Sequence, residues 1–393
     1  WRLLTAGERD VLARLSVFQG GFTAEAARAV AGASLPVLGA LADKSLLAKS
    51  GTRMQLHPLV QQMAALKLGE GAALEATLRA HITHVQRWLQ HLLPAAETGQ
   101  RDALQAIEAD FDNARAAWQH ALALGRPEAL RPGLPTLVQL FEHRARFDEG
   151  LTLLRQALQA LPAQGAQPLQ ALLLAYAALM EMRLVRYADA EATARQALAA
   201  AEGADADADV VRFQAHAVIG GTHNNSGRPA EAQQAYRLAL ALAEAGGRAH
   251  ELASTLDNLA LCEKRLGRYD EALRLSLDAL AHHRRHGDHA RTAVCLNNLG
   301  SLLMFMGQDE DSQRHLAEAL QLCERHGLTS SHAFVLSNLT ELAFKAGRFE
   351  QASDLAHRAL DLAQLGGLRA LVGWLRVQLA RLAVRRRELP AAH

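Results

Sequence analysis

The sequence predicts an all-α fold built as a solenoid of stacked helix pairs, and two observations lead to that prediction. An Ala-Leu pair recurs in steps of 40, 42, 40, 40 and 40 residues, at Ala157, Ala197, Ala239, Ala279, Ala319 and Ala359. A glycine follows the same period at Gly227, Gly267, Gly307 and Gly347. A constant period of this length is typical of repeat proteins, in which each unit packs on its neighbours alone.

Each 40-residue unit is expected to contain two helices. The apolar spacing of Leu256, Leu259 and Ala260 indicates one face of a first helix. Gly267 ends that helix, because glycine tolerates the left-handed backbone conformation of a helix C-terminus. Tyr269 begins the second helix, whose apolar stripe continues through the next Ala-Leu pair.

Composition restricts the classes of function. The 393 residues carry 42 basic and 41 acidic side chains, a net charge of +1, which gives no overall electrostatic signature of nucleic-acid binding. Cys262, Cys295 and Cys323 are widely spaced and are predicted to be small core residues of a reducing compartment. The absence of a signal peptide and of an apolar run of about 18 residues predicts a soluble, cytoplasmic protein with no membrane partner. The start at Trp1 and the half-repeat at the end lead us to expect a piece of a longer protein.

The N-terminal part, 1–70, does not follow the repeat and predicts a small winged-helix domain. Thr5 and Glu8 form a capping-box pattern at the start of a first helix, and further helices are expected over 24–31 and from Ser34 to about Lys44. A hairpin should follow within 45–56, before a helix that begins at Pro58. Three helices and a hairpin make a winged-helix arrangement.

The repeats resemble the tetratricopeptide repeat in a lengthened form, over about 131–393. The motif residues are Leu259-Ala260, Gly267-Arg268-Tyr269, Glu271-Ala272 and Ala279-Leu280, in about six copies of which the last is truncated. The first two copies depart from it, with Ala145 and Val185 in place of the glycine. The resemblance implies a right-handed superhelix, preceded by the winged-helix domain over 1–70 and by a helical linker or irregular repeat pair over 71–130.

A second resemblance covers essentially the whole chain. The stretches Leu15–Thr23, Leu41–Leu47 and Leu56–Val60 are similar to the winged-helix segment of bacterial signal-transduction ATPases with numerous domains, in the branch of maltose-activator and antibiotic-regulator type. The stretch Ile107–Ala117 resembles the helix that opens the repeat region of those proteins. The resemblance implies an ATPase module upstream of Trp1, acting in cis, with ATP or ADP bound there in the intact protein. This chain has no G-x-x-x-x-G-K-[ST] motif, so we expect no bound cofactor and no enzymatic activity in it.

His57 stands where that family has a Met-His-Asp motif, whose histidine contacts the phosphate of bound ADP. Pro58 replaces the aspartate of the motif. A structural histidine that caps the hairpin explains the residue equally well, and both interpretations stay open.

The candidate ligand site is one face of the first helices, over repeats 253–360. Carboxamides can both donate to and accept from a peptide backbone, which suits an extended ligand in the concave groove that the resemblance implies. The predicted groove residues are Asn258, Asn298, Asn338, Asp257, Asn297, Lys264, Arg265, Met304, Phe305, Glu341, Phe344 and Lys345. The alternative is that the asparagines bond only to neighbouring turns.

Other polar groups favour structural interpretations. The cluster of His282, His283, His286 and His289 with Asp288 has spacing that zinc ligands can adopt, but basic groups in a last helical turn are favoured by the helix dipole, which is the preferred interpretation. His81, His84 and His91 share a helix face with Trp88, which indicates ordinary packing. The third helix of the N-terminal domain has no arginine and one lysine, so direct nucleic-acid binding is not expected.

The sequence therefore predicts the sensor and regulatory part of a multidomain signalling ATPase, with a transcriptional regulator as the expected whole. A protein, peptide or small-molecule effector would bind in the groove. Two alternatives stay open: a tetratricopeptide scaffold for protein assembly, and the regulatory arm of a kinase or cyclase.

Overall fold

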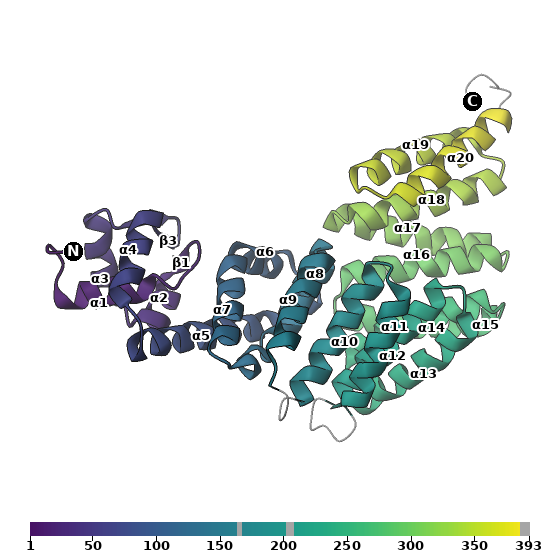
Figure 1. The fold of residues 1–393 in the computed structure, drawn as a ribbon. Coiled ribbons are helices and arrows are strands. Elements are labelled where there is room, and N and C mark those ends of the chain that lie inside the picture. Colours follow the sequence, from purple (N-terminus) through teal and green to yellow (C-terminus); the bar gives the residue numbers. More distant parts are fainter. Residues whose placement is uncertain (163–166, 202–207, 386–393) are drawn as a thin grey trace. The chain divides into compact units, whose positions relative to one another are not determined.

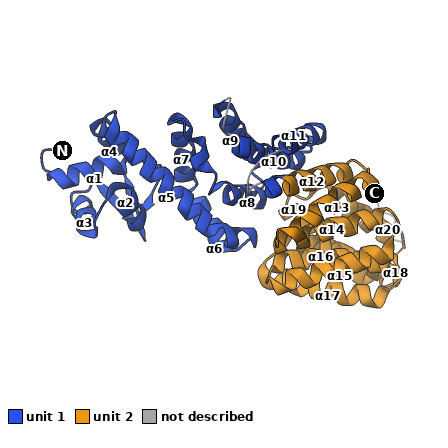
Figure 2. Ribbon diagram, turned by 90° about the horizontal axis from the view of Figure 1, so that it is seen from below, with its two compact units in different colours: residues 1–211 blue, residues 212–393 orange. Residues whose placement is uncertain are grey.

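The computed structural model describes residues 1–162, 167–201 and 208–385. The chain divides into two compact units, residues 1–211 and 212–393, with the division inside one helix (Figure 2). The fold is all-α, with a small three-stranded sheet near the N-terminus, which confirms the predicted fold class. None of the described helices combines the length and apolar character needed to span a bilayer.

The N-terminal helices begin and end close to the predicted residues. They are α1 (Ala6–Leu15), α2 (Ala24–Ala31) and α3 (Leu35–Asp43). The capping box of α1 forms as expected: the Glu8 amide donates to Thr5 Oγ1 at 3.2 Å and the Thr5 amide donates to Glu8 Oε2 at 2.8 Å.

The hairpin consists of β2 (Leu47–Ser50) and β3 (Arg53–Leu56). A third strand that was not predicted, β1 (Phe22–Thr23), pairs antiparallel with β3 so that Phe22 lies opposite Met54. A strand this short gives no periodic signal, so it depends on the tertiary contact with β3. The elements agree with the expected arrangement, and the winged-helix assignment stays a prediction.

Four further helices and one short 3-10 turn lead into the repeats. They are α4 (Pro58–Leu68), α5 (Ala72–Glu97), α6 (Arg101–Ala109), α7 (Phe111–Ala123) and the turn Pro127–Leu130. The stretch 107–117, predicted as one helix, is interrupted because Asp110 leaves helical geometry between α6 and α7. The domain boundaries near 70 and 130 stay predictions.

Within the described residues, six helix pairs and one further helix follow (Figure 1). They are α8 (Leu134–Arg144) with α9 (Phe147–Ala160), α10 (Gln167–Arg183) with α11 (Tyr187–Ala200), α12 (Ala208–Asn225) with α13 (Pro229–Ala245), α14 (Ala249–Arg265) with α15 (Tyr269–Arg285), α16 (His289–Phe305) with α17 (Asp309–His326), α18 (Thr329–Lys345) with α19 (Phe349–Leu365), and α20 (Arg369–Arg385). The predicted broken copy at 388–392 lies outside the described residues.

From α12 to α20, each repeat has one turn between its two helices and a second turn that leads to the next repeat. The predicted glycine column covers only the first kind of turn. Each reversal from α12 to α20 has a glycine with positive φ, at Gly227, Gly247, Gly267, Gly287, Gly307, Gly327, Gly347 and Gly367. The turns between repeats therefore use the same left-handed residue as the turns within them. The turns from α8 to α9 and from α10 to α11 adopt this conformation with Ala145 at φ 52° and Val185 at φ 64°.

The core between the helices of unit 2 is made of small and branched side chains. Ala272, Ala279 and Leu275 of α15 are buried, as predicted from the apolar stripe. The three cysteines are buried and free, and burial raises the pKa of both Cys262 and Cys323 to about 11. They are packing residues rather than nucleophiles.

The first helices of the repeats lie on the inner side of the curve of unit 2. Among the described helices, α16 packs on α18 and α18 on α20, while no comparably close packing joins α15 to α17 or α17 to α19. Equivalent elements approach most closely on the concave side of a curved stack. The face offered by α16, α18 and α20 therefore lies on the concave side, and the repeat register places the equivalent face of α14 next to it.

We expect Val185→Gly to stabilise the protein. A β-branched residue with positive φ is strained, whereas glycine adopts the same conformation without a steric penalty. Val185 is 66% exposed, so little packing is lost. The expected gain in the free energy of unfolding is about 1 kcal/mol, measured as a higher midpoint in urea.

The reciprocal change, Gly267→Val, is the matched control at the equivalent turn. A Cβ at Gly267 would meet nothing within 4 Å, so only the backbone conformation, φ 75°, should matter. It should lower the midpoint. A Val185→Gly protein no more stable than the wild type would show that the turn tolerates valine without strain.

Candidate functional site

The predicted carboxamide row lies on the concave face, but its three members differ in their contacts. Asn258 and Asn298 are exposed and make no hydrogen bond to any described residue. Asn338 is half-buried, and its Nδ2 donates to Asn297 Oδ1 at 2.9 Å, across from α18 to α16. The structural interpretation thus holds for Asn338 and Asn297, while Asn258 and Asn298 have carboxamides open to a ligand.

Asp257, beside Asn258 on α14, is turned to the protein. Its Oδ2 lies 2.7 Å from His283 Nε2 of α15, and His283 is buried. The pair joins the two helices of one repeat just below the concave face. Asp257 therefore supports the groove wall rather than offering a free carboxylate.

The predicted basic residues of α14 bind their neighbours along the stack. Lys264 Nζ donates to Ser301 Oγ at 3.0 Å and lies 4.4 Å from the centre of the Phe305 ring. Burial lowers the pKa of Lys264. Arg265 donates to Asn224 Oδ1 of α12 at 2.8 Å. Both cations thus connect successive repeats.

The predicted charged residues of α18 also bind neighbouring helices. Lys345 of α18 donates to Asp309 Oδ1 at 2.9 Å and to the carbonyl of half-buried Met304 at 3.3 Å. Arg381 of α20 lies 3.6 Å from Glu341 and stands over the Phe344 ring at 4.6 Å. The two cations of α14 thus bind neutral acceptors, whereas Lys345 and Glu341 form ion pairs across the seams between repeats.

Sequence reasoning missed an apolar column beside the carboxamides. Position 254 is serine, and the equivalent positions in the following three repeats are Val294, Phe334 and Trp374. These three side chains are 41%, 45% and 37% exposed. They stand about one helical turn before Asn298, Asn338 and Gln378. The repeat period applied to this column would have found them.

His57 is exposed and stands at the N-terminus of α4. Its Nδ1 accepts a hydrogen bond from the Leu59 amide at 3.3 Å, so it caps this helix rather than the hairpin. The ring edge that remains faces solvent. The cap accounts for the residue in this chain, and a nucleotide contact in the intact protein stays a prediction.

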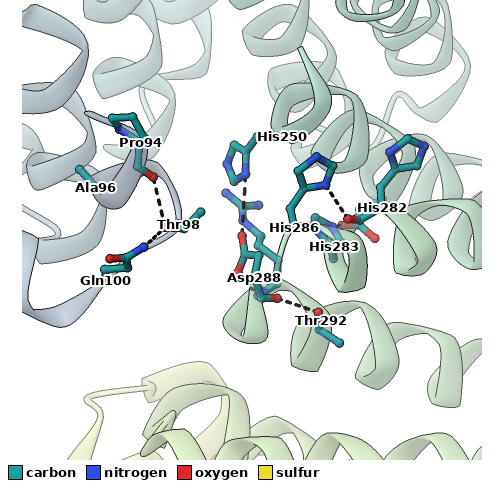
Figure 3. A network of polar contacts seen from close by, with 12 residues as sticks. Pro94, Ala96, Thr98, Gln100, His250, His282, His283, His286, Asp288 and Thr292 are labelled. Carbon is teal, nitrogen blue, oxygen red and sulfur yellow. Dashed lines mark hydrogen bonds and ion pairs between the residues drawn. The ribbon is translucent and has the colours of Figure 1, made fainter. Parts of the chain in front are cut away.

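The histidines at the end of α15 serve as structural groups (Figure 3). His286 Nδ1 lies 2.8 Å from the carbonyl oxygen of His282, and Asp288 caps α16 by accepting from the Arg291 amide at 2.9 Å. His250 approaches Asp288 at 3.7 Å. No set of three or more potential metal ligands comes together in the described part of the chain.

A polar junction in unit 1 binds the N-terminal domain to α7. Arg53 of β3 donates to both carboxylate oxygens of Asp110, at 2.7 and 2.8 Å, and to the Gly21 carbonyl at 2.5 Å. Asn113 of α7 donates to Gly21 at 2.8 Å and accepts from the Gln19 amide at 2.8 Å. The Asp110 carboxylate raises the pKa of Arg53, so this bidentate ion pair stays charged. Asp110 and Asn113 belong to the stretch 107–117 that resembles the family, but the sequence does not reveal their partners.

His81 of α5 is fully buried beside this junction, and the packing prediction for it is confirmed. Its ring lies 5.1 Å from that of Phe18 and 5.5 Å from that of His120. Neither nitrogen has a partner among the described residues. Burial above all, then the neighbouring His120 and His84, lowers the pKa of His81 to about 3. The ring is therefore neutral at physiological pH.

His84, Trp88 and His91 do more than pack. With Arg79 and Arg87 of α5 and Glu25 of α2, they line an open cavity of about 810 Å³. Asp110 and Asn113 of the junction complete its wall. This cavity was not predicted, because the sequence does not show which face of α5 the short helix α2 covers.

Comparison with known proteins supports the repeats most directly. Residues 211–284 and 251–325 match the tetratricopeptide repeat family. Proteins from Mycobacterium bovis and Mycobacterium tuberculosis named as putative HTH-type transcriptional regulators are 31% identical over 169 residues, which is 40% of this chain and 19% of each relative. The chain thus spans about a fifth of the length of the curated relatives it matches.

Two solved structures share the fold. One is a signal transduction ATPase with numerous domains from Pyrococcus horikoshii, described as having a tetratricopeptide repeat sensor; it has a TM-score of 0.74 and 15% identity over 98% of this chain and 54% of that one. The other is aspartyl phosphate phosphatase F from Bacillus subtilis, with a TM-score of 0.53 and 14% identity over 80% of this chain and 91% of that one. At such identities the likeness concerns the fold alone. This chain therefore contains tetratricopeptide repeats and is similar in fold to that ATPase.

We expect the stability of unit 1 to fall as the pH drops below about 6.5. In the unfolded state His81 takes up a proton near its ordinary pKa. The buried ring of the folded state takes up a proton only near pH 3, because its pKa is lowered to about 3. The unfolded state then binds more protons, so acid favours unfolding, by about 2 kcal/mol at pH 5 relative to pH 7.5. Urea unfolding at the two pH values measures the difference.

His81→Phe should reduce this pH dependence by the contribution of His81, whatever its effect on stability at pH 7.5, while His84 and His120, whose pKa values burial also lowers, keep part of it. His357→Gln, on the exposed surface of α19, is the control and should leave the pH response unchanged. A His81→Phe protein with the wild-type response would contradict this assignment.

Proposed function

We propose that the chain is the sensor portion of a multidomain signalling ATPase, acting in the cytoplasm in the regulation of transcription. Its concave face would bind a protein or peptide effector, and the N-terminal domain would relay this to a nucleotide-binding module in cis. Three findings support the proposal: the tetratricopeptide repeats, the fold shared with the Pyrococcus horikoshii ATPase, and the names of the mycobacterial relatives.

One observation carries the effector site. Two exposed carboxamides, Asn258 and Asn298, are unpaired among the described residues. The apolar column begins at Val294, on the same helix as Asn298. A carboxamide can hold both the N–H and the C=O of an extended backbone, while Val294, Phe334 and Trp374 can receive apolar side chains. The charged residues around them are held by bonds to the neighbouring repeats, Lys264 to Ser301 and Arg265 to Asn224, so they fix the spacing of the helices.

The relay has a physical basis within unit 1. The ion pair of Arg53 with Asp110 and the bonds of Asn113 to Gln19 and Gly21 hold the hairpin and the loop before β1 on α7. A movement of α7 would therefore displace the hairpin and the loop before β1 of the N-terminal domain. We propose no catalytic reaction and no DNA contact for this chain, because it lacks a phosphate-binding loop and α3 carries no arginine.

We expect the double variant Asn258→Ala, Asn298→Ala to weaken effector binding. Each lost neutral hydrogen bond costs about 0.5–1.5 kcal/mol, so the pair should raise the dissociation constant roughly tenfold or more. A peptide selected from a displayed random library on the wild-type chain is the ligand, and calorimetry measures its affinity. The melting temperature should be unchanged, because neither carboxamide has a partner to lose among the described residues.

The matched control is Gln313→Ala with Gln321→Ala, which removes two exposed carboxamides of α17, a second helix. It should bind as the wild type does. Equal weakening in both double variants, or none in either, would contradict the assignment of the concave face.

In the intact protein, we expect His57→Ala to loosen bound ADP and raise basal activity, if the histidine contacts the nucleotide phosphate. The measurement is the ADP retained after gel filtration. Loss of the cap of α4 alone should instead cost about 0.5–1 kcal/mol of stability, with ADP retention unchanged. The second result would assign His57 a purely structural role.

A further inference from the structure

The cavity in unit 1 has the size and the lining of a small-molecule site. Its volume of about 810 Å³ lies in the range of pockets that enclose small ligands. One wall is a single face of α5, with Ala80, His84, Arg87 and His91 at helical spacing, and the opposite wall is α2, which packs on α5. This site is separate from the concave face of the repeats, and its occupant would act in addition to the proposed effector.

The wall formed by α7 is already neutral. The Asp110 carboxylate is saturated by Arg53, which binds both of its oxygens, and by Asn113 Nδ2 at 2.7 Å. Arg79 at the rim is paired with Glu75. The cavity charges that remain are therefore those of Arg87 and Glu25, together with the imidazoles of His84 and His91.

Of these remaining groups, Arg87 can bind an anion, while Glu25 of α2 carries the balancing negative charge of the lining. Arg87 makes no ion pair or hydrogen bond to any described residue, so its guanidinium is available as a bidentate donor. His84 is half-buried, and burial lowers its pKa although Glu25 and Asp110 lie near it. A neutral imidazole offers one donor and one acceptor, and neither nitrogen of His84 is used by another described residue.

Trp88 adds an apolar surface next to Arg87. It is half-buried on the cavity wall, with Phe18 and Ala26 deeper in the lining. A flat ring can lie against the indole while its acid group meets the guanidinium. We propose that this cavity binds a small planar organic anion, an aromatic carboxylate, with its ring against Trp88, its carboxylate on Arg87 and a polar ring atom bonded to His84.

Binding here would have a structural consequence. Ligand contacts would join α2 of the N-terminal domain to α5 and to the junction residues of α7. A ligand that binds only when α2, α5 and α7 are packed together stabilises that packing. The gain grows with the logarithm of the ligand concentration divided by the dissociation constant. The cavity would thus set how firmly the N-terminal domain is held on the helices that follow it.

Calorimetry of the full 393-residue chain with indole-3-acetate, benzoate and naphthalene-2-carboxylate tests the proposal, with indole-3-acetamide as the neutral counterpart. At least one carboxylate should bind saturably, and the amide should bind about tenfold more weakly or worse, because a charge-assisted bond is lost. Absence of saturable binding by all three acids up to about 5 mM, or equal binding of indole-3-acetamide and indole-3-acetate, would overturn the proposal.

Two variants locate the site. Arg87→Gln should weaken the best acid about tenfold or more, and Ala29→Phe should block it by filling the cavity from α2. Arg101→Gln, an exposed arginine of α6 outside the lining, is the control and should bind normally. Both cavity positions are exposed, so circular dichroism should show native folding. Binding that survives both changes would place the acid elsewhere and refute the assignment.

Discussion

The repeat region depends on one backbone constraint: at each turn whose residues the structure describes in full, one residue adopts a left-handed conformation. From Gly227 to Gly367 that residue is glycine, and nearly every helix between the turns from α14 onward has 17 residues. Constant helix length and constant turn geometry bring equivalent positions into register on neighbouring helices. The carboxamide and apolar columns of the concave face are consequences of that register, because a single insertion would rotate every later side chain off the face.

The same register explains why the charged groove residues do not stand free. Positions one repeat apart face each other on adjacent first helices, so a cation on one helix meets an acceptor on the next, as Lys264 meets Ser301 and Arg381 meets Glu341. Such bonds fix the spacing of the stack. Binding capacity is left to the side chains that have no counterpart in reach, which are Asn258, Asn298 and the apolar column. A scaffold and a sensor would both bind a partner on this face. They would differ in whether that binding is relayed to a nucleotide-binding module.

The sequence predicted what is periodic or local. The helix pairs, the capping box at Thr5 and the burial of the cysteines all follow from patterns within one repeat or one turn. The turns between repeats were missed although Gly247 and Gly287 show their period plainly. The pairing of Arg53 with Asp110, 57 residues away, and the cavity between α2 and α5 have no such pattern, because they depend on how separate elements pack.

These long-range contacts gather in the part of unit 1 where the N-terminal domain meets α5 and α7. A buried neutral histidine, a bidentate ion pair and an open cavity with an unpaired arginine lie within one set of packed, described helices. His81 contributes packing without any compensating hydrogen bond to a described residue, which makes this region sensitive to protonation, while the ion pair of Arg53 holds it together. A ligand that binds this arrangement of α2, α5 and α7 preferentially would stabilise the junction directly. If the chain transmits a signal, the junction is where a small change in binding energy would have the largest structural effect.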